Sequence, residues 1–324
     1  MLESTAVPAP CEVADHRARM REDVRNGLLR HGQKELPPTY FYDARGSHLF
    51  DDITRLDEYY PTRAELALLT QYADDIVRLT SARALAELGA GTATKSRVLL
   101  RALVAHGAAQ YLPMDVDGHT LSQTAVELRV EFPALDVTPL VADMRDDVTA
   151  SGARHPLLYA FLGSTIGNFG TDDAHDLLRR IRDTFRPTDR LLIGVDLIKD
   201  VPTLHAAYND AQGVTAEFNL NVLRVLNREL HADFNLGAFQ HRAFYNVARA
   251  RIEMHLDSTR AQVVHIPHVG DVAFARGESI RTEISCKYDR QSATDMLERA
   301  GFRLTEWMTA PQPLFALALA EPTA

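Results

Sequence analysis

Two glycines, Gly89 and Gly91, follow the short apolar segment 82–88. Glycine lets the backbone turn tightly and approach a ligand without a Cβ in the way, and a helix after the turn would offer free backbone N–H groups. A dinucleotide site would have a third glycine where this chain has Thr94, and Glu87, just before the turn, suits a cation. The turn by itself is weak evidence for any one cofactor.

Carboxylates follow the next two apolar segments. Asp115 and Asp117 come after segment 110–114, and Asp143 comes after segment 137–142. Ligands of open α/β sheets bind outside the carboxyl ends of the strands, where Asp115 can accept both hydroxyl groups of a ribose and Asp143 can reach an adenine edge. The alternative is that these residues cap the following helices, and for Asp117 this alternative is as good as a ligand role.

A parallel sheet is needed to position these side chains. Apolar segments alternate with helical patterns over residues 82–196, which predicts five parallel strands with helices on both faces. Helical spacing returns at 292–300, and Gly301 can end that helix. The last apolar segments, 302–309 and 314–319, predict a terminal hairpin. We therefore expect an α/β fold with a doubly wound sheet that ends in an antiparallel β-hairpin.

The alternation stops after residue 196. Residues 204–230 predict one long helix. Residues 244–256 and 261–266 alternate between apolar and polar side chains, which predicts a β-hairpin or meander. Earlier in the chain, Thr62 and Glu65 have the spacing of a capping box at the start of a helix. We therefore expect an inserted α+β domain. The predicted boundaries are 63–198 with 287–324 for the sheet domain, and 1–62 with 199–286 for the second domain.

Composition and charge exclude several classes of protein. Of the 324 residues, 46% are hydrophobic and 24% are charged, which excludes fibrous and wholly disordered classes. The net charge of −9 leaves no chain-wide basic footprint for nucleic acid. Cys11 and Cys286 are too few for a disulfide framework and fit a reducing compartment. No apolar run approaches the roughly 20 residues of a membrane span, and the acidic N-terminus argues against a signal peptide. We expect a cytoplasmic monomer that binds neither nucleic acid nor membrane and needs no obligate protein partner.

Six separated motifs carry a more specific resemblance. They are FYD at 41–43, EYYPTR at 58–63, FLGSTIGN at 161–168, DLIKD at 196–200, GVTA with FN at 213–219, and EISCK at 283–287. With the glycine turn and the acidic strand ends, they make the chain similar to the histidine-specific Nα-methyltransferase family of ergothioneine biosynthesis, which has the class I methyltransferase fold. The resemblance covers residues 36–319, nearly the whole chain.

The resemblance implies an activity and its ligands. The activity is three successive methyl transfers from S-adenosylmethionine, the methyl donor, to the α-amino group of L-histidine. The product is hercynine, and the reaction is the first step of ergothioneine biosynthesis. The second domain would then bind the substrate. We expect no metal site, because His265 and His268 have no third ligand at a convincing spacing.

Several residues match positions that have a role in that family. They are Gly89, Lys95, Asp115, Asp143 and Met144 for the cofactor, Tyr59, Asn168 and Tyr208 for the carboxylate of the amino acid, Glu283 and Ser285 for its imidazole, and Tyr42 and Gly163 as catalytic residues near the amino group. Met144 stands where the family commonly has phenylalanine, so the adenine contact differs in detail.

Other interpretations remain open at this point. Tyr208 could pack in a long helix, Asn168 could cap the helix after it, and Glu283 could face solvent on an alternating strand. The chain could methylate another aromatic amino acid, although a substrate without an imidazole would not need Glu283 as an acceptor. It could be a non-catalytic S-adenosylmethionine-binding module, although such a module needs no amino-acid pocket. A nicotinamide dehydrogenase is disfavoured by Thr94.

Overall fold

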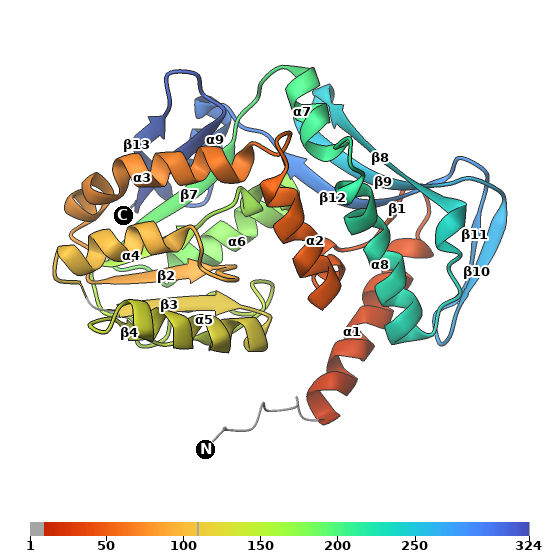
Figure 1. Ribbon diagram of the computed structural model, residues 1–324, viewed down its shortest axis with the longest axis horizontal. Helices are drawn as coiled ribbons and strands as arrows, with labels where there is room; N and C mark the ends of the chain where they lie inside the picture. The colour runs from red at the N-terminus through yellow and green to blue at the C-terminus, as the bar shows by residue number, and fades with distance from the viewer. Residues whose placement is uncertain (1–9, 109, 324) are drawn as a thin grey trace. The chain divides into compact units, whose positions relative to one another are not determined.

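The chain divides into two units. The computed structural model describes residues 10–108 and 110–323, with side chains from Arg17 onwards, so the side chain of Cys11 lies outside the described residues. Unit 1 comprises residues up to 59, 201–246 and 252–284, and unit 2 comprises residues 60–200, 247–251 and 285–324 (Figure 1). The division does not test which unit binds which ligand, and the predicted domain assignment stays a prediction.

Unit 2 is built on an eight-stranded sheet. Its strand order is β13-β14-β7-β6-β2-β3-β4, with β5 also paired to β3. The pairs among β2 to β7 are parallel, whereas β14 is antiparallel to both β7 and β13. The predicted fold class, a doubly wound sheet with a terminal antiparallel hairpin, is confirmed. The strands are β2 (Ala84–Leu88), β3 (Gln110–Asp115), β4 (Asp136–Val137), β5 (Leu140–Val141), β6 (Leu157–Phe161), β7 (Arg190–Asp196), β13 (Phe302–Thr309) and β14 (Phe315–Pro322).

The predicted strand at 137–142 differs from the structure, because it is divided into β4 and β5. Pro139 lies between them, and proline has no N–H to donate to a sheet ladder. Thr138 still donates its N–H to the carbonyl of Tyr111 at 2.9 Å. The chain therefore follows β3 to its carboxyl end with a break in the pairing.

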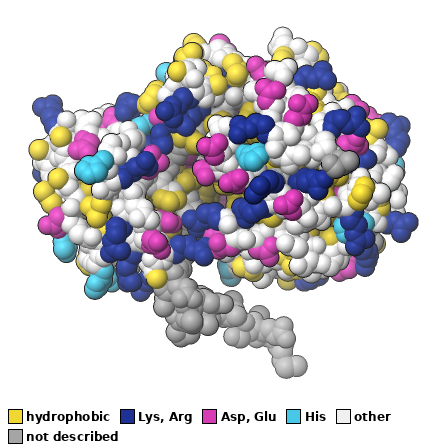
Figure 2. Space-filling view, turned by 180° about the vertical axis from the view of Figure 1, so that it is seen from behind, with side chains coloured by type: hydrophobic (Ala, Val, Ile, Leu, Met, Phe, Trp, Pro, Cys, Tyr) yellow, Lys and Arg dark blue, Asp and Glu magenta, His cyan; other side chains and the backbone are white. Residues whose placement is uncertain are grey.

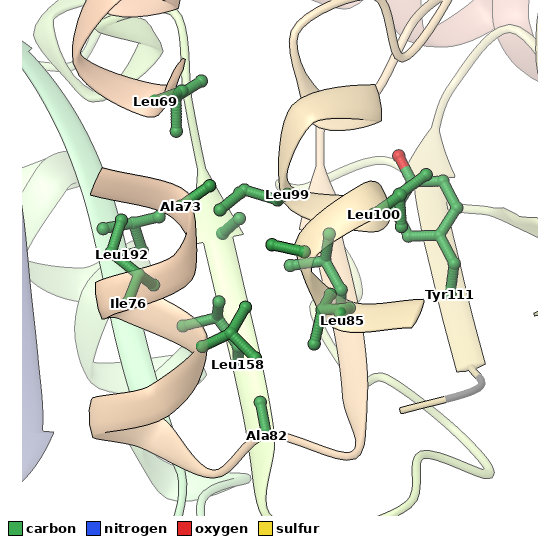
Figure 3. Packing of buried hydrophobic residues seen from close by; sticks show 14 of the residues in the cluster. Leu69, Ala73, Ile76, Ala82, Leu85, Leu99, Leu100, Tyr111, Leu158 and Leu192 are labelled. Atoms are coloured by element: carbon green, nitrogen blue, oxygen red, sulfur yellow. The ribbon is translucent and has the colours of Figure 1, made fainter. Parts of the chain in front are cut away.

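Helices cover both faces of this sheet because its strands are apolar on both sides. The helices α3 (Pro61–Thr80), α4 (Ser96–Ala105) and α5 (Gly118–Glu131) cover one face, and α6 (Thr171–Asp183) and α9 (Arg290–Arg299) cover the other. Figure 3 shows side chains of α3 and α4 packed against the central strands; labelled are Leu69, Ala73 and Ile76 of α3, Leu99 and Leu100 of α4, and Leu85, Leu158 and Leu192 of the sheet. This packing holds the carboxyl ends of the strands in register.

Unit 1 combines helices with a four-stranded sheet of order β1-β12-β9-β8 and a separate β10-β11 hairpin (Figure 1). Its helices are α1 (Pro10–Leu28), α2 (Ala44–Arg55), α7 (Val201–Tyr208) and α8 (Val214–Leu230), with short 3₁₀ turns at Pro38–Phe41 and Leu236–Ala238. Its strands are β1 (Lys34–Glu35), β8 (Phe239–Asn246), β9 (Arg251–Ser258), β10 (Gln262–Ile266), β11 (Gly270–Phe274) and β12 (Ser279–Cys286).

The single long helix predicted for 204–230 is wrong, since the structure has α7 and α8 separated by a turn. Asp210 accepts hydrogen bonds from the N–H groups of Val214 and Thr215, both at 2.8 Å. Gly213 has a φ of 75°, in the left-handed region that favours glycine. This local capping satisfies the first N–H groups of α8 and stops α7 from continuing.

The surface gives two further observations. In the part of the chain that the structure describes, no helix is long and apolar enough to cross a membrane. The face seen in Figure 2 carries Lys and Arg side chains interspersed with Asp and Glu side chains.

Candidate functional site

The glycine turn after β2 brings two predicted cofactor residues together. Gly89 and Gly91 have φ angles of 70° and 51°, which are accessible to glycine at little cost. Gly89 donates its N–H to the carbonyl of Met114 at 2.8 Å, and Gly91 donates to Oδ2 of Asp115 at 2.9 Å. The turn after β2 is therefore tied to the carboxyl end of β3, with Asp115 at its side.

Asp117 has the capping role that the sequence left open. Its Oδ1 accepts from the N–H groups of His119 and Thr120 at 3.0 and 3.1 Å, which are the first free donors of α5. Asp115 does not cap this helix. Its Oδ1 accepts from the N–H of Asp117 at 3.1 Å, and it remains partly exposed at the strand end.

Asp143 and Met144 lie beyond the end of β5. The carboxylate of Asp143 accepts from the backbone and guanidinium of Arg145, with the shortest distance 2.8 Å to Nη2. A carboxylate has about four acceptor positions, and the backbone N–H, Nε and Nη2 of Arg145 all donate to this one. The Cε of Met144 lies 3.8 Å from where a Cβ on Gly89 would be, so Met144 borders the glycine turn.

Glu65 is a site residue that the sequence interpretation missed. It does not form the predicted capping box, because α3 begins at Pro61 without a side-chain cap. Instead Glu65 is fully buried, pairs with the ammonium of Lys95, and accepts from the N–H of Gly163 at 2.8 Å. Gly194 of β7 makes room for it, since a Cβ there would lie 2.0 Å from Oε1 of Glu65. The predicted residues Lys95 and Gly163 thus share a buried carboxylate, which no local sequence pattern reveals.

Glu87 lies directly beneath the glycine turn and is only 3% exposed. It accepts hydrogen bonds from the hydroxyl groups of Ser96 and Tyr111. Burial raises the pKa of Glu87 to about 7, and these two hydrogen bonds limit the rise. Glu87 therefore connects the start of α4 to β3, and its partners in the structure are hydroxyl groups.

The segment after β6 contains two predicted residues, Gly163 and Asn168. Gly163 and Ser164 both have positive φ angles, 78° and 56°, and a short 3₁₀ helix, Thr165–Asn168, follows. The proposal that Asn168 caps α6 is wrong, because the N-cap of α6 is Gly170 and no side-chain cap bond is made there. Asn168 is partly buried, and its amide is not used as a helix cap.

Asp196, at the carboxyl end of β7, is the centre of a buried charge cluster that the sequence interpretation did not identify. Its carboxylate contacts Nζ of Lys199 at 2.5 Å and Nζ of Lys287 at 2.9 Å. It also accepts from the hydroxyl of Tyr60 at 2.8 Å. Lys287 in turn donates to Oγ of Ser285 at 2.7 Å. The sequence does contain a signal for this cluster. The motif DLIKD contains Asp196 and Lys199, and the motif EISCK contains Ser285 and Lys287.

In unit 1, three predicted tyrosines belong to one aromatic cluster. Ring centroids are 5.8 Å apart for Tyr42 and Phe50, 6.3 Å for Phe50 and Tyr59, and 6.3 Å for Tyr59 and Tyr208. Phe218 packs on Tyr42 and Phe50 at 5.7 and 6.0 Å. Phe50 and Phe218 were missed from sequence, because their role is to connect tyrosines that are distant along the chain.

The backbone of Tyr208 is held by a buried histidine. Nε2 of His241 donates to the carbonyl of Tyr208 at 2.9 Å, and Nδ1 accepts from the amide of Asn219 at 2.8 Å. Burial lowers the pKa of His241, in agreement with a neutral ring that both donates and accepts. The hydroxyl of Thr282 donates to Asn219 at 2.6 Å, so the network reaches β12.

Glu283 and Ser285 are two residues apart on β12, so their side chains leave the same face of the strand. Ser285 is 4% exposed, and Glu283 is partly buried. The alternative of a solvent-facing Glu283 and the proposed role at the imidazole both stay predictions.

His265, one of the two histidines considered as metal ligands, has a carboxylate partner in the structure. Nδ1 of His265 is bonded to Asp271 at 2.7 Å across the β10-β11 hairpin. Among the described residues there is no group of three or more His, Cys, Asp or Glu side chains arranged to hold a metal ion.

Comparison with known proteins gives consistent matches over most of the chain. A family model described as histidine-specific methyltransferase, SAM-dependent, matches residues 20–322. The chain is 44% identical over 303 residues to a histidine N-alpha-methyltransferase of Mycolicibacterium smegmatis, which covers 93% of this chain and 94% of that relative. It is 30% identical over 297 residues to ergothioneine biosynthesis protein 1 of Neurospora crassa, covering 85% of this chain and 32% of that protein. An L-tryptophan methyltransferase of Psilocybe serbica is 27% identical over 321 residues, 89% of each chain.

The contact between Gly194 and Glu65 leads to a stability prediction. In Gly194→Ala, the added methyl group would lie 2.0 Å from Oε1 of Glu65, so a buried, paired carboxylate must move within a packed core. We expect the free energy of unfolding, measured by urea denaturation, to fall by about 2–4 kcal/mol. Gly237→Ala is the matched control, since its nearest atom would be at 3.4 Å, and it should change stability by less than about 1 kcal/mol. Equal effects of the two variants would contradict the close approach.

The raised pKa of Glu87 predicts how stability changes with pH. The folded state holds the Glu87 proton up to about pH 7, whereas the ordinary pKa is 4.5. The folded state therefore binds more protons between these values, and stability falls as pH rises through this window. Glu87→Gln keeps an acceptor oxygen but cannot ionise, so its Tm relative to wild type should rise by a few degrees between about pH 5 and about pH 8. Differential scanning calorimetry measures this, and a difference independent of pH would refute the assignment.

Proposed function

The chain belongs to the family of histidine-specific, S-adenosylmethionine-dependent methyltransferases, and we infer from this membership that it methylates the α-amino group of L-histidine in ergothioneine biosynthesis. The observation that carries this function is 44% identity to a histidine N-alpha-methyltransferase over 93% of the chain and 94% of that relative. Three successive transfers would give hercynine.

S-adenosylmethionine is the methyl donor, and its sulfonium supplies the methyl group. We propose that Asp115 accepts the ribose hydroxyl groups and that Asp143 and Met144 contact the adenine, with Gly89 and Lys95 completing the site. The contact between Gly91 and Asp115 at 2.9 Å supports this proposal, as does the position of Met144 beside the glycine turn. These contacts would keep the backbone of the glycine turn, the carboxylate of Asp115 and the side chain of Met144 close to the same ligand.

The carboxylate of histidine is proposed to bind Tyr59, Tyr208 and Asn168. Phenol hydroxyl and amide N–H groups are neutral donors that suit a carboxylate. The shared aromatic cluster of Tyr59 and Tyr208 supports this role, since packed rings hold their hydroxyl groups with few accessible rotamers. The amide of Asn168 also fits, because it is not used as a helix cap.

The imidazole ring is proposed to lie against Glu283 and Ser285. An ionised carboxylate only accepts hydrogen bonds, so Glu283 requires a ring N–H, and Ser285 serves the second nitrogen. A buried acceptor that is left unpaired by a wrong ligand gives strong discrimination. The phenyl ring of phenylalanine has no donor to offer Glu283.

Methyl transfer to an amine needs a neutral nitrogen in line with the methyl group, so catalysis is mainly positioning and the exclusion of water. Tyr42 and Gly163 are proposed to orient the amine. The N–H of Gly163 already donates to Glu65, which leaves its carbonyl as the group that can accept from the amine. No strong base is required if water carries the proton away, and a quaternary nitrogen has no lone pair for a fourth transfer.

A second candidate is the methylation of another aromatic amino acid, since a relative with 27% identity is an L-tryptophan methyltransferase.

We also propose that the protein is a monomer and that it is located in the cytoplasm. Among the described residues Cys286 forms no disulfide, in agreement with the proposed reducing compartment.

The reaction itself can be tested directly. The purified protein is incubated with S-adenosylmethionine and an equimolar mixture of amino acids, and the products are identified by mass spectrometry. We expect histidine to gain three methyl groups while the other amino acids are unchanged. A shift on tryptophan alone would support the second candidate, and no shift on any amino acid would rule out the enzyme and favour a binding module.

Glu283→Ala tests the assignment of the imidazole site. Loss of a charged hydrogen-bond acceptor should weaken histidine affinity roughly 10- to 100-fold, with the affinity for S-adenosylmethionine within about twofold of wild type. Calorimetry with L-histidine in the presence of S-adenosylhomocysteine measures the affinity without turnover. The exposed Glu306 provides the control variant Glu306→Ala, and unchanged histidine affinity in Glu283→Ala would remove Glu283 from the site.

A further inference from the structure

Two ammonium groups share the single carboxylate of Asp196 inside unit 2. The side chains of Asp196 and Lys287 are 1% and 0% exposed, and that of Lys199 is 6% exposed. Burial alone would raise the pKa of Asp196, but the ammonium groups of Lys287 and Lys199 hold it below its ordinary value. Buried charge is costly even when it is paired, and Asp200 adds a Coulombic interaction with Lys199. Two buried ammonium groups around one carboxylate therefore call for an explanation beyond stability.

The two lysines have different partners. Lys199 lies over the ring of Tyr60 at 4.3 Å and donates to its hydroxyl and to the carbonyl of Leu197, both at 2.6 Å. These contacts hold the ammonium group of Lys199 against Tyr60 and Leu197. Lys287 instead directs Nζ to Oγ of Ser285 at 2.7 Å. Lys287 therefore connects the Asp196 carboxylate to a residue proposed to contact the substrate ring.

The chemistry of this contact determines the direction of the hydrogen bond. An ammonium group has three donors and no acceptor, so Oγ of Ser285 must accept from Lys287, and the hydroxyl hydrogen must point away from it. A hydroxyl that accepts from a cation is also a stronger donor through its own hydrogen, because hydrogen bonds in a chain polarise one another. Ser285 is thereby prepared to donate to an acceptor.

We propose that Lys287, held by Asp196, is a positioning residue that makes Ser285 a hydrogen-bond donor and so selects a ring with an unprotonated nitrogen. This inference rests on the proposed function of Ser285 at the imidazole. Glu283 requires one ring N–H and Ser285 requires one ring lone pair, and neutral imidazole is the amino-acid side chain that offers both. Imidazolium has no lone pair to accept from Ser285.

The same pair of requirements separates histidine from tryptophan. An indole N–H can satisfy Glu283, so Glu283 alone does not distinguish the two rings. Indole has no nitrogen lone pair in its plane, so it cannot accept a hydrogen bond from Ser285 as imidazole can. Lys287 and Ser285 are therefore expected to determine selectivity against indole.

Lys287→Met and Lys287→Gln form the first part of the test. Methionine removes the donor, whereas glutamine keeps an N–H donor without the charge. We expect Lys287→Met to weaken the affinity for L-histidine about tenfold and to reduce the preference for histidine over tryptophan, with S-adenosylmethionine affinity within about twofold of wild type. Lys287→Gln should recover most of the loss. Calorimetry in the presence of S-adenosylhomocysteine gives the affinities, and thermal unfolding reports the folded state of each variant.

Lys199→Met is the matched control. It removes the other ammonium group from Asp196, and among the described residues Lys199 bonds to Asp196, Tyr60 and Leu197 rather than to Ser285. A purely structural role for the cluster predicts equal losses of histidine affinity in Lys199→Met and Lys287→Met, which would overturn the inference. We expect Lys199→Met to change thermal stability and to leave the preference for histidine over tryptophan as in wild type.

A double-mutant cycle separates this inference from the proposed function. In a Ser285→Ala background, Lys287→Met should cause no further loss of histidine affinity, because both act through one hydroxyl. If Ser285→Ala weakens histidine binding and Lys287→Met does not, the positioning role is overturned while the proposed site stands. If Ser285→Ala has no effect, the assignment of Ser285 to the imidazole fails, and the inference fails with it.

Nitrogen NMR tests the inference on the wild-type protein, so the result does not depend on whether a variant folds. L-histidine labelled with ¹⁵N in the ring is bound together with S-adenosylhomocysteine, and the ring nitrogen shifts report protonation. We expect one protonated and one unprotonated nitrogen in the bound ring. Two protonated nitrogens would overturn the inference, because Ser285 would then face a donor.

Discussion

A carboxylate enclosed in a protein interior must be given donors or counter-charges, and unit 2 has three such groups near the carboxyl ends of its strands. Asp196 has two ammonium groups, Glu65 has the ammonium of Lys95 and the N–H of Gly163, and Glu87 has two hydroxyl groups. Each group has low exposure because helices cover both faces of the sheet. The partners are therefore held in place by a fixed electrostatic requirement as well as by packing.

Two of these carboxylates, Asp196 and Glu87, have pKa values shifted in opposite directions, and the difference follows from their partners. Counter-charges keep the pKa of Asp196 low, whereas the hydroxyl partners of Glu87 leave burial dominant and its pKa raised to about 7. Asp196 can thus serve as a permanent anion that holds Lys287. Glu87 serves as a hydrogen-bonded connection between α4 and β3.

The chain belongs to the histidine-specific methyltransferase family, so these buried carboxylates and their partners belong to a methyltransferase. Methyl transfer to an amine needs little acid–base catalysis, but it needs the amine and the methyl group to be correctly oriented. In the proposed site, selectivity depends on the direction of hydrogen bonds. An acceptor for a ring N–H in that site does not by itself separate imidazole from indole, because both rings carry an N–H.

Much of the fold was predictable because its signals are local. Alternating apolar and helical segments predicted the doubly wound sheet, and Gly89 could be recognised since a tight turn needs glycine immediately after a strand. The errors arose where nearby side chains competed with periodicity. Asp210 accepts from the first N–H groups of a new helix within a segment that apolar spacing would have made one helix. Pro139 divides a strand that hydrophobicity alone makes continuous.

The sequence by itself determined the order of the elements, the family motifs and the residue types available for the ligands. Only the tertiary structure decided which carboxylate meets which donor. Glu65 has the spacing of a capping residue, yet the fold buries it against Lys95 and Gly163. Asp196 and Lys287 belong to distant motifs, and their pairing depends on the strands that bring them together. Hydrogen-bond direction and pKa are set by neighbours in space, which is why residue types alone could not supply them.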